Sequence, residues 1–316
     1  MKRKVIQLAG KTSVVSLPSA WIKKNGIKKG EELDVIEYGN DLLIKNSSTP
    51  IKECITLDVS DLNSRAFACA MSALHKFGYD EITLLHNKPL HFKELSEHIS
   101  NLFLGFVVID QSSTKTVLKS IANDSQSEFD SSLRRAFLVT LSLADSSYEA
   151  LNNKNFEGIE HLVNLENTNN QLTSFCLRLI NKRMYKETKK THFIYIIIWT
   201  LEKVADEYKH ICNEMSVYKK ELNQEILNTY KLTNDFLKIY YDLFYKFNIE
   251  LMNSSLEQSK QISILLGNLT PKNNNEMKII NHLNSVNYKL YDLSSSIFAL
   301  NHDNIKELKK PVYSIN

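Results

Sequence analysis

The chain has 316 residues, of which 43% are hydrophobic and 24% charged, so its composition excludes collagen-like and disordered proteins and its length suggests about two or three domains. Its net charge is +3, but residues 1–50 hold nine basic residues against five acids, so the rest of the chain sums to −1. The four cysteines are widely spaced and form no CxxC pair, and the first residues do not resemble a secretory signal, so we expect a cytoplasmic protein. No apolar run approaches the ~20 residues that a membrane span needs, so we expect the chain not to span a membrane.

The first residues predict a small unit of strands and turns around one short helix. Pro18 opens that helix and Asn25-Gly26 ends it. So small a β unit cannot bury enough apolar surface alone, so we expect it to dimerise through interleaved hairpins. Runs rich in β-branched residues predict its strands, over residues 5–8, 13–17, 33–38 and 42–44.

Basic residues are concentrated at the start of the chain, because residues 1–29 contain eight of them and no acid. A positive field confined to one small region suits a polyanion, and each phosphate contact would add to a salt-dependent affinity for nucleic acid. The alternative is that lysine-rich turns only keep a small domain soluble. The candidate DNA-binding residues are Lys2, Arg3, Lys4, Lys11, Lys23 and Lys24.

The same segment carries three motifs in order, namely the SLPSAW junction, the GIKKGEELDV turn and strand, and the closing GNDLLI. With these motifs it resembles the AbrB/SpoVT swapped-hairpin domain across its whole length. The resemblance implies a swapped-hairpin β-barrel formed by an intertwined homodimer, whose basic N-terminal surface contacts DNA.

Residues 51–122, which follow a polar linker and Pro50, alternate between strand and helix patterns. Short connections between the two types predict a small two-layer α/β domain. It contains no glycine-rich phosphate loop and no nucleophile elbow, so we expect no enzymatic activity. Strands are predicted over residues 54–59, 81–85, 106–109 and 116–121, and helices over 61–77 and 92–103.

The remaining residues predict a helical bundle, because apolar side chains recur at spacings of three and four. When the third predicted helix is aligned with the sixth so that Leu201 matches Leu283, Val204 also matches Val286. A duplication of a three-helix unit would give such an alignment. Any two amphipathic helices align in this way, so the sequence leaves duplication open. Six helices are predicted, over residues 128–152, 156–183, 190–216, 221–247, 249–268 and 276–307.

Glu202 and Asp206 stack at i and i+4 on one helix face, where like charges repel by about a few tenths of a kcal/mol. A bound cation would remove that repulsion, because paired carboxylates are good ligands for hard metals. The alternative is a solvated face on which Lys203, Lys209 and His210 screen the two acids.

The run LEKVADEY resembles the LERxxD helix of PhoU-type proteins, and ENTNNQLTSFCLRLIN resembles the preceding PhoU helix. The resemblance implies a six-helix PhoU-like bundle of two three-helix repeats. It also implies a divalent or iron cluster held by ExxxD carboxylates, with Glu202 and Asp206 as the best ligands. At three positions where the resemblance implies a carboxylate, the chain has Asn170, Asn284 and Tyr288. The alternative is therefore a bundle that kept its packing and lost its metal.

Two further groups of side chains favour packing roles. An aromatic patch in the fourth predicted helix suits a bundle core better than a base-stacking platform. Three histidines, His86, His91 and His98, lack the spacing of a paired helical metal site. The aromatic patch comprises Tyr240, Tyr241, Phe244, Tyr245 and Phe247.

Together the parts predict a multi-domain α+β chain with boundaries at 1–47, 51–122 and 126–310. In this combination it resembles the archaeal-type phosphate uptake regulator-like proteins, which implies a cytoplasmic, homodimeric, DNA-binding transcriptional regulator of phosphate uptake and homeostasis. The alternative is an adaptor whose bundle docks a phosphate transporter or sensor kinase while the first domain only dimerises. A metal-dependent hydrolase is disfavoured, because no activated nucleophile or base pair is visible.

Overall fold

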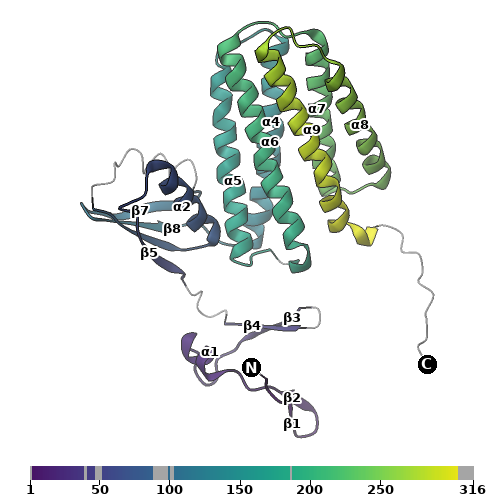
Figure 1. Cartoon of the computed structure of the whole chain (residues 1–316). Coiled ribbons are helices and arrows are strands. Elements are labelled where there is room, and N and C mark those ends of the chain that lie inside the picture. Colours follow the sequence, from purple (N-terminus) through teal and green to yellow (C-terminus); the bar gives the residue numbers. More distant parts are fainter. Residues whose placement is uncertain are drawn as a thin grey trace, which may run out of the picture. The chain divides into compact units, whose positions relative to one another are not determined.

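The structure is a computed structural model that describes residues 2–38, 41–46, 52–87, 99, 103–185 and 187–304. The chain divides into two compact units, Met1–Glu53 and Cys54–Asn316 (Figure 1). We call the first unit the head. The second unit holds both a sheet and a helical bundle, and the division into three domains stays a prediction. None of the described helices combines the length and apolar character that a membrane span requires.

The head contains two antiparallel hairpins and one short helix, so the predicted elements are confirmed. Helix α1 begins after Pro18 and ends at Asn25, whose side-chain amide donates a hydrogen bond to the Trp21 carbonyl oxygen (2.8 Å). The two hairpins form separate two-stranded sheets within the described residues, so the closed barrel stays a prediction. The elements are β1 (Ile6–Leu8), β2 (Thr12–Val14), α1 (Ser19–Lys24), β3 (Asp34–Tyr38) and β4 (Asp41–Lys45).

The second unit begins with a four-stranded sheet in the order β5-β6-β8-β7, on which α2 packs. Strands β5 and β6 are parallel and the other pairs antiparallel. Helix α2 ends at Gly78, whose φ of +114° is a conformation that favours glycine. The predicted strands and first helix are confirmed, whereas the helix predicted over 92–103 lies outside the described residues except at 99 and 103. The elements are β5 (Cys54–Asp58), α2 (Ser64–Phe77), β6 (Glu81–Leu85), β7 (Phe106–Gln111) and β8 (Lys115–Ser120).

Long helices make up the rest of the second unit, and their apolar faces share one continuous core. Several of them begin after an asparagine whose side chain accepts a hydrogen bond from a backbone N–H of the first turn, as Asn223, Asn248 and Asn273 do. The long helices are α4 (Gln126–Asn152), α5 (Val163–Asn181), α6 (Thr191–Tyr218), α7 (Gln224–Tyr245), α8 (Ile249–Asn268) and α9 (Asn274–Leu300). Short 3-10 turns lie at Ile159–Leu162, Thr188–Lys190 and His302–Asn304.

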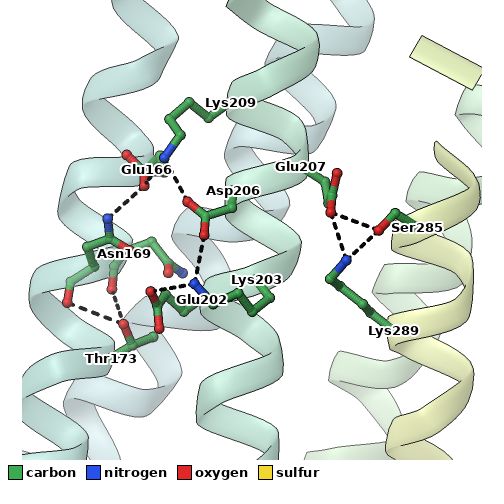
Figure 2. A network of polar contacts seen from close by, with 11 residues as sticks. Glu166, Asn169, Thr173, Glu202, Lys203, Asp206, Glu207, Lys209, Ser285 and Lys289 are labelled. Carbon is green, nitrogen blue, oxygen red and sulfur yellow. Dashed lines mark hydrogen bonds and ion pairs between the residues drawn. The ribbon is translucent and has the colours of Figure 1, made fainter. Parts of the chain in front are cut away.

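The helices form two groups of three, α4–α5–α6 and α7–α8–α9, which meet where α6 packs on α9 and α4 on α7. At the first of these contacts, Glu207 accepts hydrogen bonds from Ser285 (2.8 Å) and Lys289 (2.7 Å), as Figure 2 shows. Glu207 and Lys289 are equivalent positions under the offset that places Leu201 on Leu283. Two related halves facing each other would bring equivalent positions together in this way, although the duplication itself stays a prediction.

Arg178 of α5 ties the helices to the sheet. Its side chain is fully buried, and its guanidinium donates hydrogen bonds to the Tyr79 carbonyl oxygen (2.6 Å) and the Asp80 carboxylate (2.8 Å). The guanidinium also lies 5.2 Å from the centre of the Phe106 ring and 3.5 Å from the Asp124 carboxylate. A buried charge of this kind is tolerated only while its partners remain, because an unpaired one is strongly destabilising.

We expect Arg178→Met to lower the free energy of unfolding of the second unit by about 2 kcal/mol or more, because it removes the buried donor to the Tyr79 carbonyl oxygen and one cation beside Asp80 and Asp124. These two carboxylates would keep Lys182 as an ion-pair partner. Urea unfolding followed by circular dichroism measures this loss. The matched control is Lys231→Met, which removes an exposed ion pair with Asp235 and should cost less than about 1 kcal/mol. Similar losses in the two variants would contradict a structural role for the buried contact.

Candidate nucleic-acid interface

All of the predicted DNA-binding side chains are exposed, and none forms an ion pair with another described residue. Exposed, uncompensated cations are the groups that can approach a phosphate backbone without first breaking an internal contact. Their positions differ. Lys2, Arg3 and Lys4 precede β1, Lys11 lies in the turn between β1 and β2, and Lys23 and Lys24 end α1.

The first hairpin separates two of these groups. Lys4 lies at its open end, beside the pairing of Ile6 with Val14, whereas Lys11 lies at its closed end. Lys4 and Lys11 are five residue steps apart along the hairpin, which at about 3.3 Å per residue places them about 16 Å apart. The basic residues are therefore spread along the hairpin and do not converge on one point, which suits an extended polyanion better than a single small anion.

The head leaves its apolar side chains uncovered, since no described residue before residue 54 is buried. So many exposed apolar side chains in one small unit favour an interaction site, because a monomeric protein rarely leaves large apolar patches in water. The large apolar side chains that remain exposed are Val5, Ile6, Leu8, Val15, Val35, Ile36 and Leu42.

The second hairpin exposes apolar side chains on both of its faces. Val35 and Ile36 are neighbours in β3 and therefore point to opposite faces, yet 60% and 43% of their respective surfaces are exposed. Val35 shares its face with Leu42 of β4, which is 66% exposed. A partner on one face alone would leave the other in water, so the pattern favours a partner that wraps the hairpin.

Residues 6–52 match the family model of MazE, described as antidote-toxin recognition MazE, bacterial antitoxin. The head carries a MazE-type, AbrB-like domain. Domains of this type bind DNA and form dimers. No curated protein and no solved structure matches the chain. The AbrB-like prediction is thus confirmed for the head, while the PhoU-like and archaeal parts of the resemblance stay predictions.

The second predicted site lies between α5 and α6, where lysines bridge the carboxylates (Figure 2). The Lys203 ammonium nitrogen lies 3.1 Å from the Glu202 carboxylate and 2.9 Å from that of Asp206. The Lys209 nitrogen lies 2.7 Å from both Asp206 and Glu166, which links α6 to α5. Three acids and two lysines therefore form one continuous network.

The pKa values of two acids in this network, Glu166 and Asp206, shift in opposite directions. Burial raises the pKa of Glu166, which outweighs the lowering effect of its hydrogen bond from Lys209. Burial also opposes the charge of Asp206, but hydrogen bonds from Lys209 and Lys203 lower its pKa to about 2. Asn170, at a position where the resemblance implied a carboxylate, donates its amide to Glu166 (2.6 Å). The acid oxygens are therefore occupied by donors from the chain itself.

These residues do not fit the metal cluster that the resemblance implied. Ammonium groups stand between the carboxylates, where a metal ion would have to bind, and like charges in that place repel. Among the described residues, no group of three or more His, Cys, Asp or Glu side chains could hold a metal ion. Tyr288, at the matching position of α9, is 54% exposed. The bundle that kept its packing and lost its metal stays a prediction, and the lysine-paired carboxylates are consistent with it.

The sequence pointed to the acids but not to their partner on α5. The spacing of three between Lys203 and Asp206, and again between Asp206 and Lys209, is the local signal for two of the ion pairs. The bond from Lys209 to Glu166 crosses between helices, and nothing local in the sequence encodes it. Arg178 carried a signal of its own, since an arginine among the apolar residues of α5 must find a buried partner.

We expect the double substitution Lys203→Gln and Lys209→Gln to raise the affinity of the chain for Mn²⁺ at least about tenfold, because it removes two positive charges next to the carboxylates. Calorimetric titration of both proteins with Mn²⁺ measures the change. The control variant replaces Lys231 and Lys238 of α7, whose acidic partners lie on α7 and α4, and should bind like the natural chain. Stoichiometric Mn²⁺ retained by the natural chain through gel filtration would refute this account.

Proposed function

We propose that the protein is a non-enzymatic, homodimeric regulator whose head binds duplex DNA. The observation that carries the proposal is the head itself, which combines a MazE-type domain with six exposed basic side chains at the predicted positions. The apolar surface left open on both hairpins supports a homodimer, because a second head offers the same surface in return. Dimerisation would present twelve basic groups to one duplex, which strengthens a phosphate-directed contact.

We infer that phosphate uptake is the regulated process, and this part rests on the sequence resemblance of α5 and α6 to PhoU helices. The bundle would sense or dock a component connected with phosphate status. Since its carboxylates are bridged by lysines, it would do so without a metal cluster. The sheet, joined to α5 through Arg178, would connect the bundle to the head by way of β5 and the linker.

The family match also favours a second candidate, an antitoxin-type regulator, since the matched model describes a protein that recognises a toxin. In that case the partner would be a protein as well as DNA. The adaptor with a purely dimerising head remains the alternative, and it differs from both in predicting no DNA affinity.

Duplex binding by the full-length protein, followed by fluorescence anisotropy across a range of salt concentrations, separates these candidates. We expect affinity to fall steeply with salt, and the triple substitution of Lys2, Arg3 and Lys4 by Gln to reduce the salt slope by about 3 per protomer. The reduction follows from the loss of three phosphate contacts in each head.

The matched control replaces three exposed lysines of the second unit, Lys189, Lys238 and Lys260, by Gln. It carries the same change in net charge, so it should keep the slope of the natural chain. An equal loss in both triple variants would show a nonspecific charge effect, and no binding even at low salt would favour the adaptor.

A further inference from the structure

A cavity of about 230 Å³ lies in the second unit, between α4, α7 and the segment that leads into α6. Three of its lining residues, Phe129, Leu133 and Ile194, are buried and form an apolar floor. The cavity is smaller than the roughly 300–1,000 Å³ of drug-sized sites, so it suits a compact ligand of few atoms. It lies outside the carboxylate network and outside the basic head.

Aromatic rings form much of the wall. The Phe129 and Tyr185 rings have centres 5.2 Å apart, and those of Phe244 and Tyr245 are 4.9 Å apart and nearly perpendicular. Tyr245 is 45% exposed, so its ring reaches the rim while Phe129 remains on the floor. The faces of such rings carry negative electrostatic potential, which attracts cations within about 6 Å.

The charged groups among the described lining residues are Asp130 and Glu187. Asp130 accepts a hydrogen bond from the Gln126 amide (2.8 Å), and Glu187 forms an ion pair with Lys190 (2.7 Å). Burial raises the pKa of Tyr185 to about 12, and the negative charges of Glu187 and Asp130 act in the same direction. The tyrosine hydroxyl therefore stays neutral, and no lysine, arginine or histidine is among the described lining residues.

We propose that this cavity binds a small organic cation, an ammonium group that carries alkyl substituents. Aromatic walls and an apolar floor favour the alkyl groups, while the aromatic rings and the Asp130 carboxylate favour the positive charge, since Glu187 already pairs with Lys190. An anion would be repelled by Asp130, and a strongly hydrated metal ion would gain nothing from the apolar floor. A cation already uses one of these rings, because the Arg134 guanidinium lies 5.8 Å from the centre of the Tyr245 ring.

This site is distinct from the proposed DNA contact, since none of its residues belongs to the head. It would give the helical bundle a ligand of its own, held by groups from three helices and one connecting segment. The DNA-binding proposal and this one can therefore fail independently.

The test is calorimetric titration of the full-length protein with choline and with its neutral isostere 3,3-dimethyl-1-butanol. We expect choline to bind at least about tenfold more tightly, because only the cation gains from the aromatic rings and the Asp130 carboxylate. Asp130→Asn should weaken choline binding several-fold and leave the neutral isostere unaffected. Tyr245→Ala, with its fold checked by circular dichroism, should weaken choline binding as well.

The control is Asp235→Asn, which removes an acid from α7 away from the cavity and should bind choline like the natural chain. Three results would overturn the proposal. They are no heat of choline binding up to about 10 mM, equal binding of the neutral isostere, and equal weakening by Asp130→Asn and Asp235→Asn. Because Asp130 is an exposed surface residue, its variant should fold even if Tyr245→Ala does not.

Discussion

The structure depends on one constraint, which is that the head cannot bury its own apolar side chains. Each large apolar side chain that moves from water into a packed interface contributes about 1.5–3 kcal/mol, and the head leaves several of them open. Because Val35 and Ile36 lie on opposite faces of one hairpin, the missing cover must reach both sides. The interleaved hairpins of a second copy, which we propose, would meet that demand, and the same assembly would set two cationic surfaces next to each other.

In the second unit, several charges are paired internally. Arg178 is held by a carbonyl oxygen and carboxylates, and Lys209 bridges acids on neighbouring helices. The second unit also exposes lysines, such as Lys189 and Lys260. We propose the nucleic acid contact in the head because the head carries the MazE-type domain and its first 29 residues hold eight basic residues and no acid.

Local patterns in the sequence predicted most of the elements, because strand and helix periodicities are set by neighbouring residues. The start of α5 was predicted too early, at residue 156, because Gly158 takes a φ of +79° and a 3-10 turn follows it before the helix begins at Val163. The acids of the second site were also visible. Their neutralisation by Lys209, and the cavity around Tyr245, depend on packing between distant segments, which periodicity does not encode.

Sedimentation velocity on the full-length protein and on Leu42→Glu tests the central claim most directly. The account predicts a dimer for the natural chain at micromolar concentration, and a monomer for the variant, because a carboxylate at the open face of the second hairpin would be buried unpaired in the assembly. The control Ile264→Glu, at an exposed apolar position of α8, should remain dimeric. A monomeric natural chain, or a Leu42→Glu variant that still dimerises, would contradict the account.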